Sequence, residues 1–195
     1  MSLKDTRKAA EDYVTDLFLN NPDDRLIYHN LEHTRKVVAH TTELAMFYKL
    51  DEERRFVVET AAWFHDTGYI FKGPAGHEEE SVRIMEQFIL PDKKVSGLAI
   101  TIAQCILTTK RSTYPVLFSE KILCDADTYH FGSPEFRQTD LLVKKEIELL
   151  TGSKTVEWTK HTITMLEKHQ FYTGYCKERL EAGKAENLAW LRSLL

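Results

Sequence analysis

The residues best placed for chemistry are His65 and Asp66, which are adjacent at the end of an apolar run. A buried imidazole and a buried carboxylate are costly unless a partner satisfies them. A divalent cation is such a partner, because nitrogen and carboxylate ligands together suit borderline and hard metal ions. His33 upstream and Asp127 downstream complete a set of two histidines and two aspartates. We therefore expect these four residues to bind a metal ion.

This set of residue types matches the needs of a catalytic divalent ion, whose ligands must fix it yet leave positions open for water and substrate. Two carboxylates also nearly balance the charge of the ion, which still acidifies water and attracts a phosphoryl oxygen. Each residue alone has an ordinary alternative: a capping or core histidine for His33, a helix C-terminal pair for His65 and Asp66, and a capping or solvated aspartate for Asp127. Their combination at inward-facing positions favours the metal site.

The candidate ligands lie on segments with the apolar periodicity of helices. Asn30 can cap a helix that carries His33 in its first turn, on the inward face. Asp51 opens the next helix with acidic residues that suit its positive end, and this helix delivers the His-Asp pair in its last turns. Asp127 lies on a helix over about residues 119–129. Helices of a bundle can bring such residues to one interior point.

Helical periodicity extends over nearly the whole chain, with no Asn-Gly or Asp-Gly hairpin and no sustained alternation. The pattern predicts helices over about residues 4–19, 30–48, 51–66, 77–88, 92–109, 119–129, 134–150, 154–170 and 174–193. The Gly/Pro-rich segment 71–76 is the clearest loop. We therefore expect an all-α fold, a single-domain bundle of eight or nine helices over residues 1–195.

Composition and charge are those of an ordinary globular chain: 43% of the 195 residues are hydrophobic and 29% are charged, which suits one large core. The net charge of −4 argues against a dedicated nucleic-acid-binding protein. Three cysteines without CxxC spacing indicate buried thiols rather than a disulfide scaffold. The charged N-terminus lacks a signal-peptide core, and no apolar stretch approaches the roughly 20 residues that span a bilayer. We expect a cytoplasmic protein without a membrane partner.

Three segments resemble motifs of the HD-domain metal-dependent phosphohydrolases: Tyr28–His33 (YHNLEH), Ala61–Asp66 (AAWFHD) and Leu123–Asp127 (LCDAD). They occur in the order found in that family, and the chain is most similar to a branch of predicted HD phosphohydrolases with a YHNxxH opening. The resemblance implies an HD-domain or PDEase-like helical fold, with a motif-bearing core at about 25–150 and C-terminal helices 153–195 packed on it. It implies the same four metal ligands that the residue types suggest: His33, His65, Asp66 and Asp127.

One departure from the family pattern concerns the number of ions. Dinuclear members carry a further histidine near the end of the fifth helix, where this chain reads Ile106–Arg111 without one. We therefore expect one tightly bound divalent ion rather than two, and Mn, Mg, Fe, Co, Ni and Zn are all compatible with such a site. Lys110 and Arg111 could contact a substrate phosphate. Alternatively, they are two exposed basic residues that suit a helix C-terminus.

Three further residues are candidates for acid or base chemistry. In distant phosphodiesterases with a similar YHNxxH string the first histidine protonates the leaving oxygen, a role that the resemblance gives to His29. His77 and Glu78 follow the Gly/Pro loop and begin a helix, so either they lie near the metal or they are ordinary residues of a helix N-terminus. Asp66 or Asp127 could orient the attacking water as well as bind the ion.

The expected function is hydrolysis of a phosphoester or phosphoanhydride bond in a small phosphorylated molecule, with a nucleotide as the favoured substrate. One alternative is a non-catalytic nucleotide-binding or regulatory HD module that keeps the metal site. Another is a di-iron HD-type oxygenase, which would need more ligands than this chain evidently offers. The sequence does not determine the oligomeric state, and a homodimer is compatible with it.

Overall fold

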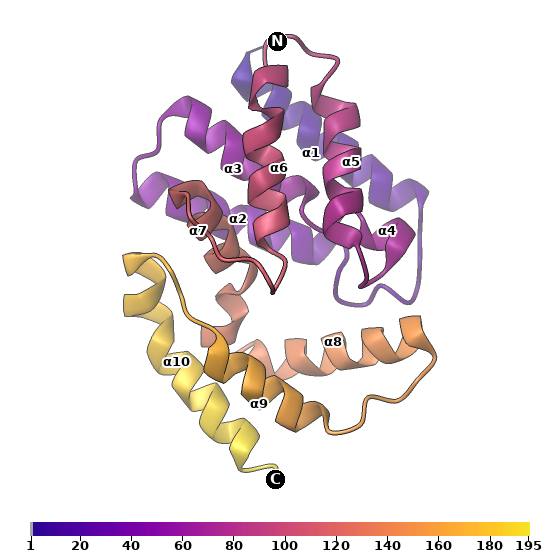
Figure 1. Ribbon diagram of the computed structural model, residues 1–195, viewed down its shortest axis with the longest axis vertical. Coiled ribbons are helices and arrows are strands. Elements are labelled where there is room, and N and C mark those ends of the chain that lie inside the picture. The colour runs from indigo at the N-terminus through magenta and orange to yellow at the C-terminus, as the bar shows by residue number, and fades with distance from the viewer. Residues whose placement is uncertain (1) are drawn as a thin grey trace.

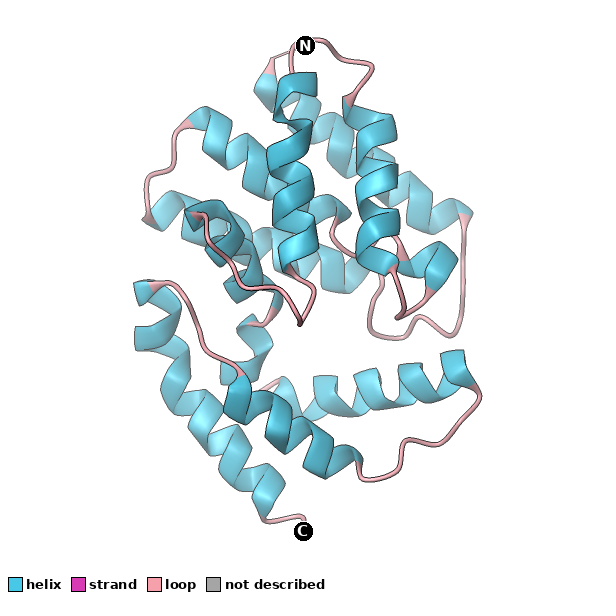
Figure 2. Cartoon of the chain, viewed as in Figure 1, coloured by secondary structure: helices cyan, strands magenta, loops and turns pink. Residues whose placement is uncertain are grey.

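Residues 2–195 are described by a computed structural model, and their regular secondary structure is entirely helical (Figures 1 and 2). Within this range nine helices have ten residues or more: α1 (Leu3–Asn20), α2 (Leu31–Phe47), α3 (Glu52–Phe64), α5 (His77–Ile89), α6 (Ala99–Thr108), α7 (Phe118–Asp127), α8 (Phe136–Thr151), α9 (Trp158–Lys168) and α10 (Gly174–Arg192). The shorter elements are α4 (Tyr69–Lys72) and the 3₁₀ helices η1 (Ser96–Leu98) and η2 (Tyr129–Gly132). The expected all-α fold is confirmed. None of these helices is long and apolar enough to cross a membrane.

The helices that carry the candidate ligands begin at the expected capping residues. The Asn30 side chain accepts hydrogen bonds from the backbone N–H groups of Glu32 and His33, at 3.0 and 3.2 Å. The Asp51 side chain accepts one from the backbone N–H of Arg54 at 2.8 Å. Such caps satisfy backbone donors that the first turn of a helix leaves free, at about 1 kcal/mol each. They therefore fix where α2 and α3 begin.

Helix α3 lies at the centre of the upper layer in Figure 1, packed against α1, α2, α6 and α7. All of its residues from Phe56 to Phe64 are buried. Burying one large apolar side chain contributes about 1.5–3 kcal/mol, so this helix anchors the core that surrounds it. The His-Asp pair directly follows α3, which places it in the interior of the molecule.

The C-terminal helices α8, α9 and α10 form a second layer below the first (Figure 1). Residues 129–132, which form η2, connect the layers, because both α8 and α10 pack on them. Helix α10 lies very close to η2, because a Cβ atom at Gly183 of α10 would lie 2.1 Å from the carbonyl oxygen of Gly132. The Asn187 side chain also donates to the carbonyl oxygens of Phe131 and Ser133, at 3.0 and 2.9 Å. These contacts set how the second layer faces the first.

Two expected helix boundaries were wrong by several residues. The helix expected over 92–109 begins as η1 and then α6, because the Asp92 side chain caps a turn by accepting the backbone N–H of Lys94. The helix expected from residue 154 begins at Trp158, after Glu157 adopts a left-handed φ of 56°. The expected loop 71–76 overlaps the end of α4, and its two glycines have positive φ. At the beginnings of α6 and α9 a local turn thus replaces helix that periodicity alone predicts.

Candidate metal centre

His33, His65, Asp66 and Asp127 converge on one buried point. His33 lies in the first turn of α2, the His-Asp pair follows α3, and Asp127 is the last residue of α7. One ligand atom from each residue lies within 4.8 Å of the other three. The structure thus brings together the four residues singled out in the sequence, in an arrangement that could hold a metal ion.

The atoms that face this point are two imidazole nitrogens and two carboxylate oxygens. His33 Nε2 lies 3.2 Å from Asp66 Oδ2 and 3.3 Å from Asp127 Oδ1. His65 Nε2 lies 3.0 and 3.6 Å from the same two oxygens. Although these are ion-pair distances, both nitrogens are buried, and neither has a hydrogen-bond partner of proper geometry among residues 2–195. Two buried ring nitrogens without partners, between two carboxylates, fit a divalent cation.

The orientation of His65 supports this fit. Its Nδ1 lies 2.8 Å from the carbonyl oxygen of Ala62, which can only accept, so Nδ1 carries the hydrogen. The neutral ring therefore presents the lone pair of Nε2 to the cluster. Metal-binding histidines are commonly held in this way, with the second ring nitrogen donating to a carbonyl or carboxylate.

Strong electrostatic coupling holds the cluster together. Burial disfavours protonation of His33 and His65, yet the nearby Asp66 and Asp127 carboxylates outweigh it and raise the pKa of both imidazoles. Burial likewise disfavours ionisation of the two aspartates, but the two imidazoles lower the pKa of both carboxyl groups. The site therefore attracts positive charge, and a divalent ion would compete with protons for the two histidines.

His77 approaches the cluster from the N-terminus of α5. Its Nε2 lies 3.5 Å from Asp66 Oδ1, and its Nδ1 donates to the carbonyl oxygen of Pro74 at 3.0 Å. Gly68 permits this approach, because a Cβ atom there would lie 2.0 Å from the carbonyl oxygen of His77. Glu78 is buried beside His77, with Oε2 3.5 Å from His77 Nδ1, and lies outside the four-residue cluster.

His29 is held against the same region from a different direction. Its ring stacks on Tyr69 with the ring centres 3.9 Å apart and the planes 5° apart. Tyr69 in turn contacts the His77 ring at 4.1 Å, so one aromatic side chain separates the two candidate proton donors. The centre of the His29 ring lies 5.6 Å from that of His33. His29 is thus close to the cluster without being one of its four members.

Glu146 of α8 is a functional candidate that the sequence did not reveal. Its side chain is fully buried, and its Oε1 pairs with His29 Nδ1. Its Oε2 accepts the backbone N–H groups of Tyr28 and His29 at 2.7 and 2.9 Å. Glu146 therefore fixes both the backbone and the ring of His29. In the sequence it is one more acidic residue on an amphipathic helix, and no local signal marks it.

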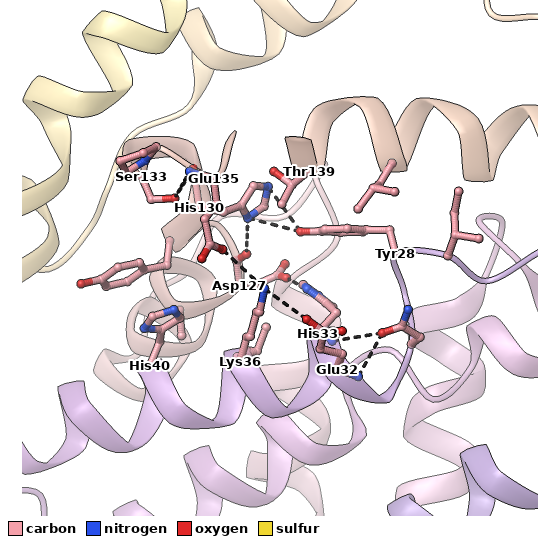
Figure 3. A pocket seen from close by; sticks show the side chains of 17 residues that line it. Tyr28, Glu32, His33, Lys36, His40, Asp127, His130, Ser133, Glu135 and Thr139 are labelled. Carbon is pink, nitrogen blue, oxygen red and sulfur yellow. Dashed lines mark hydrogen bonds and ion pairs between the residues drawn. The ribbon is translucent and has the colours of Figure 1, made fainter. Parts of the chain in front are cut away.

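Two cavities meet at the cluster. The first, of about 500 Å³, is lined by α2, η2 and α8 and reaches His33 and Asp127 (Figure 3). The second, of about 410 Å³, reaches Asp127 and His29 from the other side. Tyr28 and His130 border both cavities. Burial and the neighbouring His33 lower the pKa of His130 to about 3, so the His130 ring is uncharged at neutral pH.

Lys110 and Arg111 line the second cavity, together with His29 and Asp127. Lys110 Nζ is paired with Glu79 Oε1 at 2.5 Å, and this pair is exposed. Arg111 is exposed as well. The structure therefore places both basic residues on the wall of the cavity that contains His29, outside the four-residue cluster.

Comparison with known proteins agrees with this geometry. The family model described as HD domain matches residues 30–132, which is more than half of the chain and includes all four residues of the cluster. No curated protein and no solved structure shows a significant match.

Proposed function

This chain belongs to the HD-domain family, and on that premise we propose that it is a metal-dependent phosphohydrolase acting on a small phosphorylated molecule, with a nucleotide as the favoured substrate. The observation that carries the proposal is the burial of two unpartnered imidazole nitrogens, His33 Nε2 and His65 Nε2, between two carboxylates. His33, His65, Asp66 and Asp127 would hold the ion. A bound divalent ion supplies acidification of water and polarisation of the phosphoryl group.

The residues around the cluster suit the proton transfers of phosphoester cleavage. Glu146 accepts a hydrogen bond from Nδ1 of His29, which leaves Nε2 of that ring to deliver a proton to the leaving oxygen. His77 lies against Asp66 and is the alternative proton donor, with Glu78 beside it. Asp66 Oδ1 faces His77 rather than His33 or His65, so it is available to orient a water molecule.

The second cavity provides the place for the substrate. It joins His29 and Asp127 to the basic side chains of Lys110 and Arg111. Positive charge stabilises the charge that spreads over phosphoryl oxygens during transfer. We assign the non-reacting phosphate oxygens to this basic wall.

The direct experiment is a panel of nucleoside mono-, di-, tri- and cyclic phosphates with the Mn²⁺-loaded protein, measuring phosphate or nucleoside release. We expect turnover of at least one class and its loss in Asp66→Asn, whose size is unchanged but which lacks the charge. Glu167→Gln on the exposed face of α9 is the matched control. Saturable binding without product would indicate a regulatory nucleotide-binding module instead, and iron content with oxygen consumption would indicate an oxygenase.

A further inference from the structure

Asp140 of α8 is a buried carboxylate in the wall of the second cavity, away from the metal centre. It is 8% exposed. Its Oδ1 accepts two hydrogen bonds from α9, one from Trp158 Nε1 and one from Thr162 Oγ1, both at 3.0 Å. All three residues line the cavity that also reaches His29 and Asp127.

The second carboxylate oxygen of Asp140, Oδ2, indicates that a ligand could bind there. Both hydrogen bonds end on Oδ1, and within residues 2–195 no side chain or backbone group donates to Oδ2. Burial raises the pKa of the Asp140 carboxyl group, and this effect outweighs the hydrogen bonds from Trp158 and Thr162 and the positive charge of Lys144, which lower it. Asp140 Oδ2 is not among the fully buried polar atoms that lack a partner, so it is open to the cavity and can accept a hydrogen bond from a ligand there.

The surroundings of Asp140 indicate what kind of ligand would donate. The indole of Trp158 is held in place by its own N–H, so its face is preorganised. Phe131 and Tyr172 add further aromatic surface to the same cavity. Flat apolar surfaces of this kind suit a planar ring, and a carboxylate oxygen accepts from an amino group on that ring. The cavity volume of about 410 Å³ lies in the usual range for small-molecule sites.

We propose that Asp140 and Trp158 form a nucleobase subsite, in which Asp140 Oδ2 accepts a hydrogen bond from an exocyclic amino group of the base. This inference rests on the proposed function, because it assigns the base of the nucleotide to the far wall of the cavity that holds its phosphate. One continuous cavity connects the metal centre to the subsite. Asp140 is then a specificity-determining residue.

The variant that tests the proposal is Asp140→Asn. Its amide oxygen can take the place of Oδ1 and keep the bonds from Trp158 and Thr162, while its NH₂ takes the place of Oδ2. The group at the position of Oδ2 thereby changes from a hydrogen-bond acceptor to a donor, while the side-chain volume stays nearly constant. The matched control is Glu148→Gln, the same change on the same helix, at a residue outside the cavity.

The first arm measures kcat/KM for two pairs of nucleoside monophosphates whose members differ by one amino group. One pair is adenosine monophosphate and purine riboside monophosphate, and the other is guanosine monophosphate and inosine monophosphate. We expect the wild-type protein and Glu148→Gln to prefer the amino-bearing member of at least one pair by ~10–100-fold, since a base without the amine would cover a charged acceptor and leave it unpaired. In Asp140→Asn this preference should fall to within ~3-fold, because the hydrogen bond from the amino group of the base to residue 140 is lost.

The second arm measures binding of the corresponding nucleosides, without phosphate, by calorimetry. Amine-dependent nucleoside binding that Asp140→Asn abolishes would support the subsite even if no nucleotide is hydrolysed, in which case only the proposed function fails. Equal preferences in the wild-type protein and Asp140→Asn, with hydrolysis intact, would overturn the subsite. So would discrimination between ribose and 2′-deoxyribose substrates without any effect of the amine. If the variant does not fold, a wild-type protein without any preference for the amine would still overturn the subsite, whereas a clear preference would support it.

Discussion

Glu146→Gln should reduce turnover strongly while the protein remains folded. Oε2 of Glu146 accepts the backbone N–H groups of Tyr28 and His29, whereas Oε1 pairs with the His29 ring. The amide oxygen of glutamine can keep both backbone bonds by taking the place of Oε2. Its NH₂ then faces His29 Nδ1, so that a protonated His29 would place two donors against each other.

The magnitudes follow from these three hydrogen bonds. Replacing a hydrogen bond to a charged group, about 1.5–3 kcal/mol, with a neutral one, about 0.5–1.5, costs about 1–1.5 kcal/mol, so the two backbone bonds together should cost about 2–3 kcal/mol of unfolding free energy. The effect on kcat should be larger, ~10²-fold or more, because the acid form of His29 loses the carboxylate that stabilises and orients it. Glu146→Ala differs: two buried backbone donors lose their acceptor, at about 1–3 kcal/mol each, so the fold itself should lose about 2–6 kcal/mol.

Three measurements separate these effects. Urea unfolding gives the stability of each variant, steady-state kinetics on the best nucleotide of the panel gives kcat, and nitrogen NMR of the His29 ring gives its tautomer. We expect hydrogen on Nδ1 in the neutral ring of the wild-type protein and on Nε2 in Glu146→Gln. Unchanged kcat together with an unchanged tautomer would refute the role assigned to Glu146.

Three further predictions concern packing, pH and metal removal. Gly183→Ala should lower the unfolding free energy by at least about 2 kcal/mol, because its Cβ would lie 2.1 Å from the carbonyl oxygen of Gly132. Burial and the neighbouring Lys184 lower the pKa of His169 from 6.5 to about 4, so unfolding takes up a proton between these pH values. Stability should therefore fall as the pH drops from 6.5 to 4, by up to about 3 kcal/mol from this residue. Chelation should lower the melting temperature, because an ion that binds only the folded state stabilises it.

Each of these predictions has a control. Gly97→Ala should change the unfolding free energy by less than about 0.5 kcal/mol, since no atom beyond the neighbouring residues lies within 4 Å of the added Cβ. A larger loss of unfolding free energy in Gly97→Ala than in Gly183→Ala would contradict the packing argument. His169→Gln cannot be protonated and should remove its part of the acid destabilisation, whereas an unchanged pH profile would assign that destabilisation elsewhere. Melting temperatures that are the same with and without chelator would argue against a bound ion.

Much of the fold follows from the sequence, because apolar periodicity and capping residues are local signals. Asn30 and Asp51 cap the helices as expected, and the His-Asp pair lies at the inner end of α3. The beginnings of α6 and α9 were misplaced, because turns stabilised by side chains compete with helix at residues that periodicity includes. Sequence alone does not decide that competition.

The candidate site is predictable only in part, for a related physical reason. The burial of residues in apolar segments, such as His65, can be predicted from their apolar neighbours in the sequence. Glu146 and Asp140 lie on an amphipathic helix whose charged residues would ordinarily face solvent, and both are buried by contacts with other segments of the chain. Their partners, His29 and Trp158, are distant in sequence, so the pairs exist only once the second layer is in place.

The central claim is that His33, His65, Asp66 and Asp127 hold one divalent ion, and elemental analysis of the purified protein tests it most directly. We predict about one divalent ion per chain in the wild-type protein and in His161→Ala, an exposed histidine outside the cluster. His65→Ala and the isosteric Asp66→Asn should lose the ion while circular dichroism still reports a helical fold. Metal content that stays the same in both folded cluster variants would contradict the account.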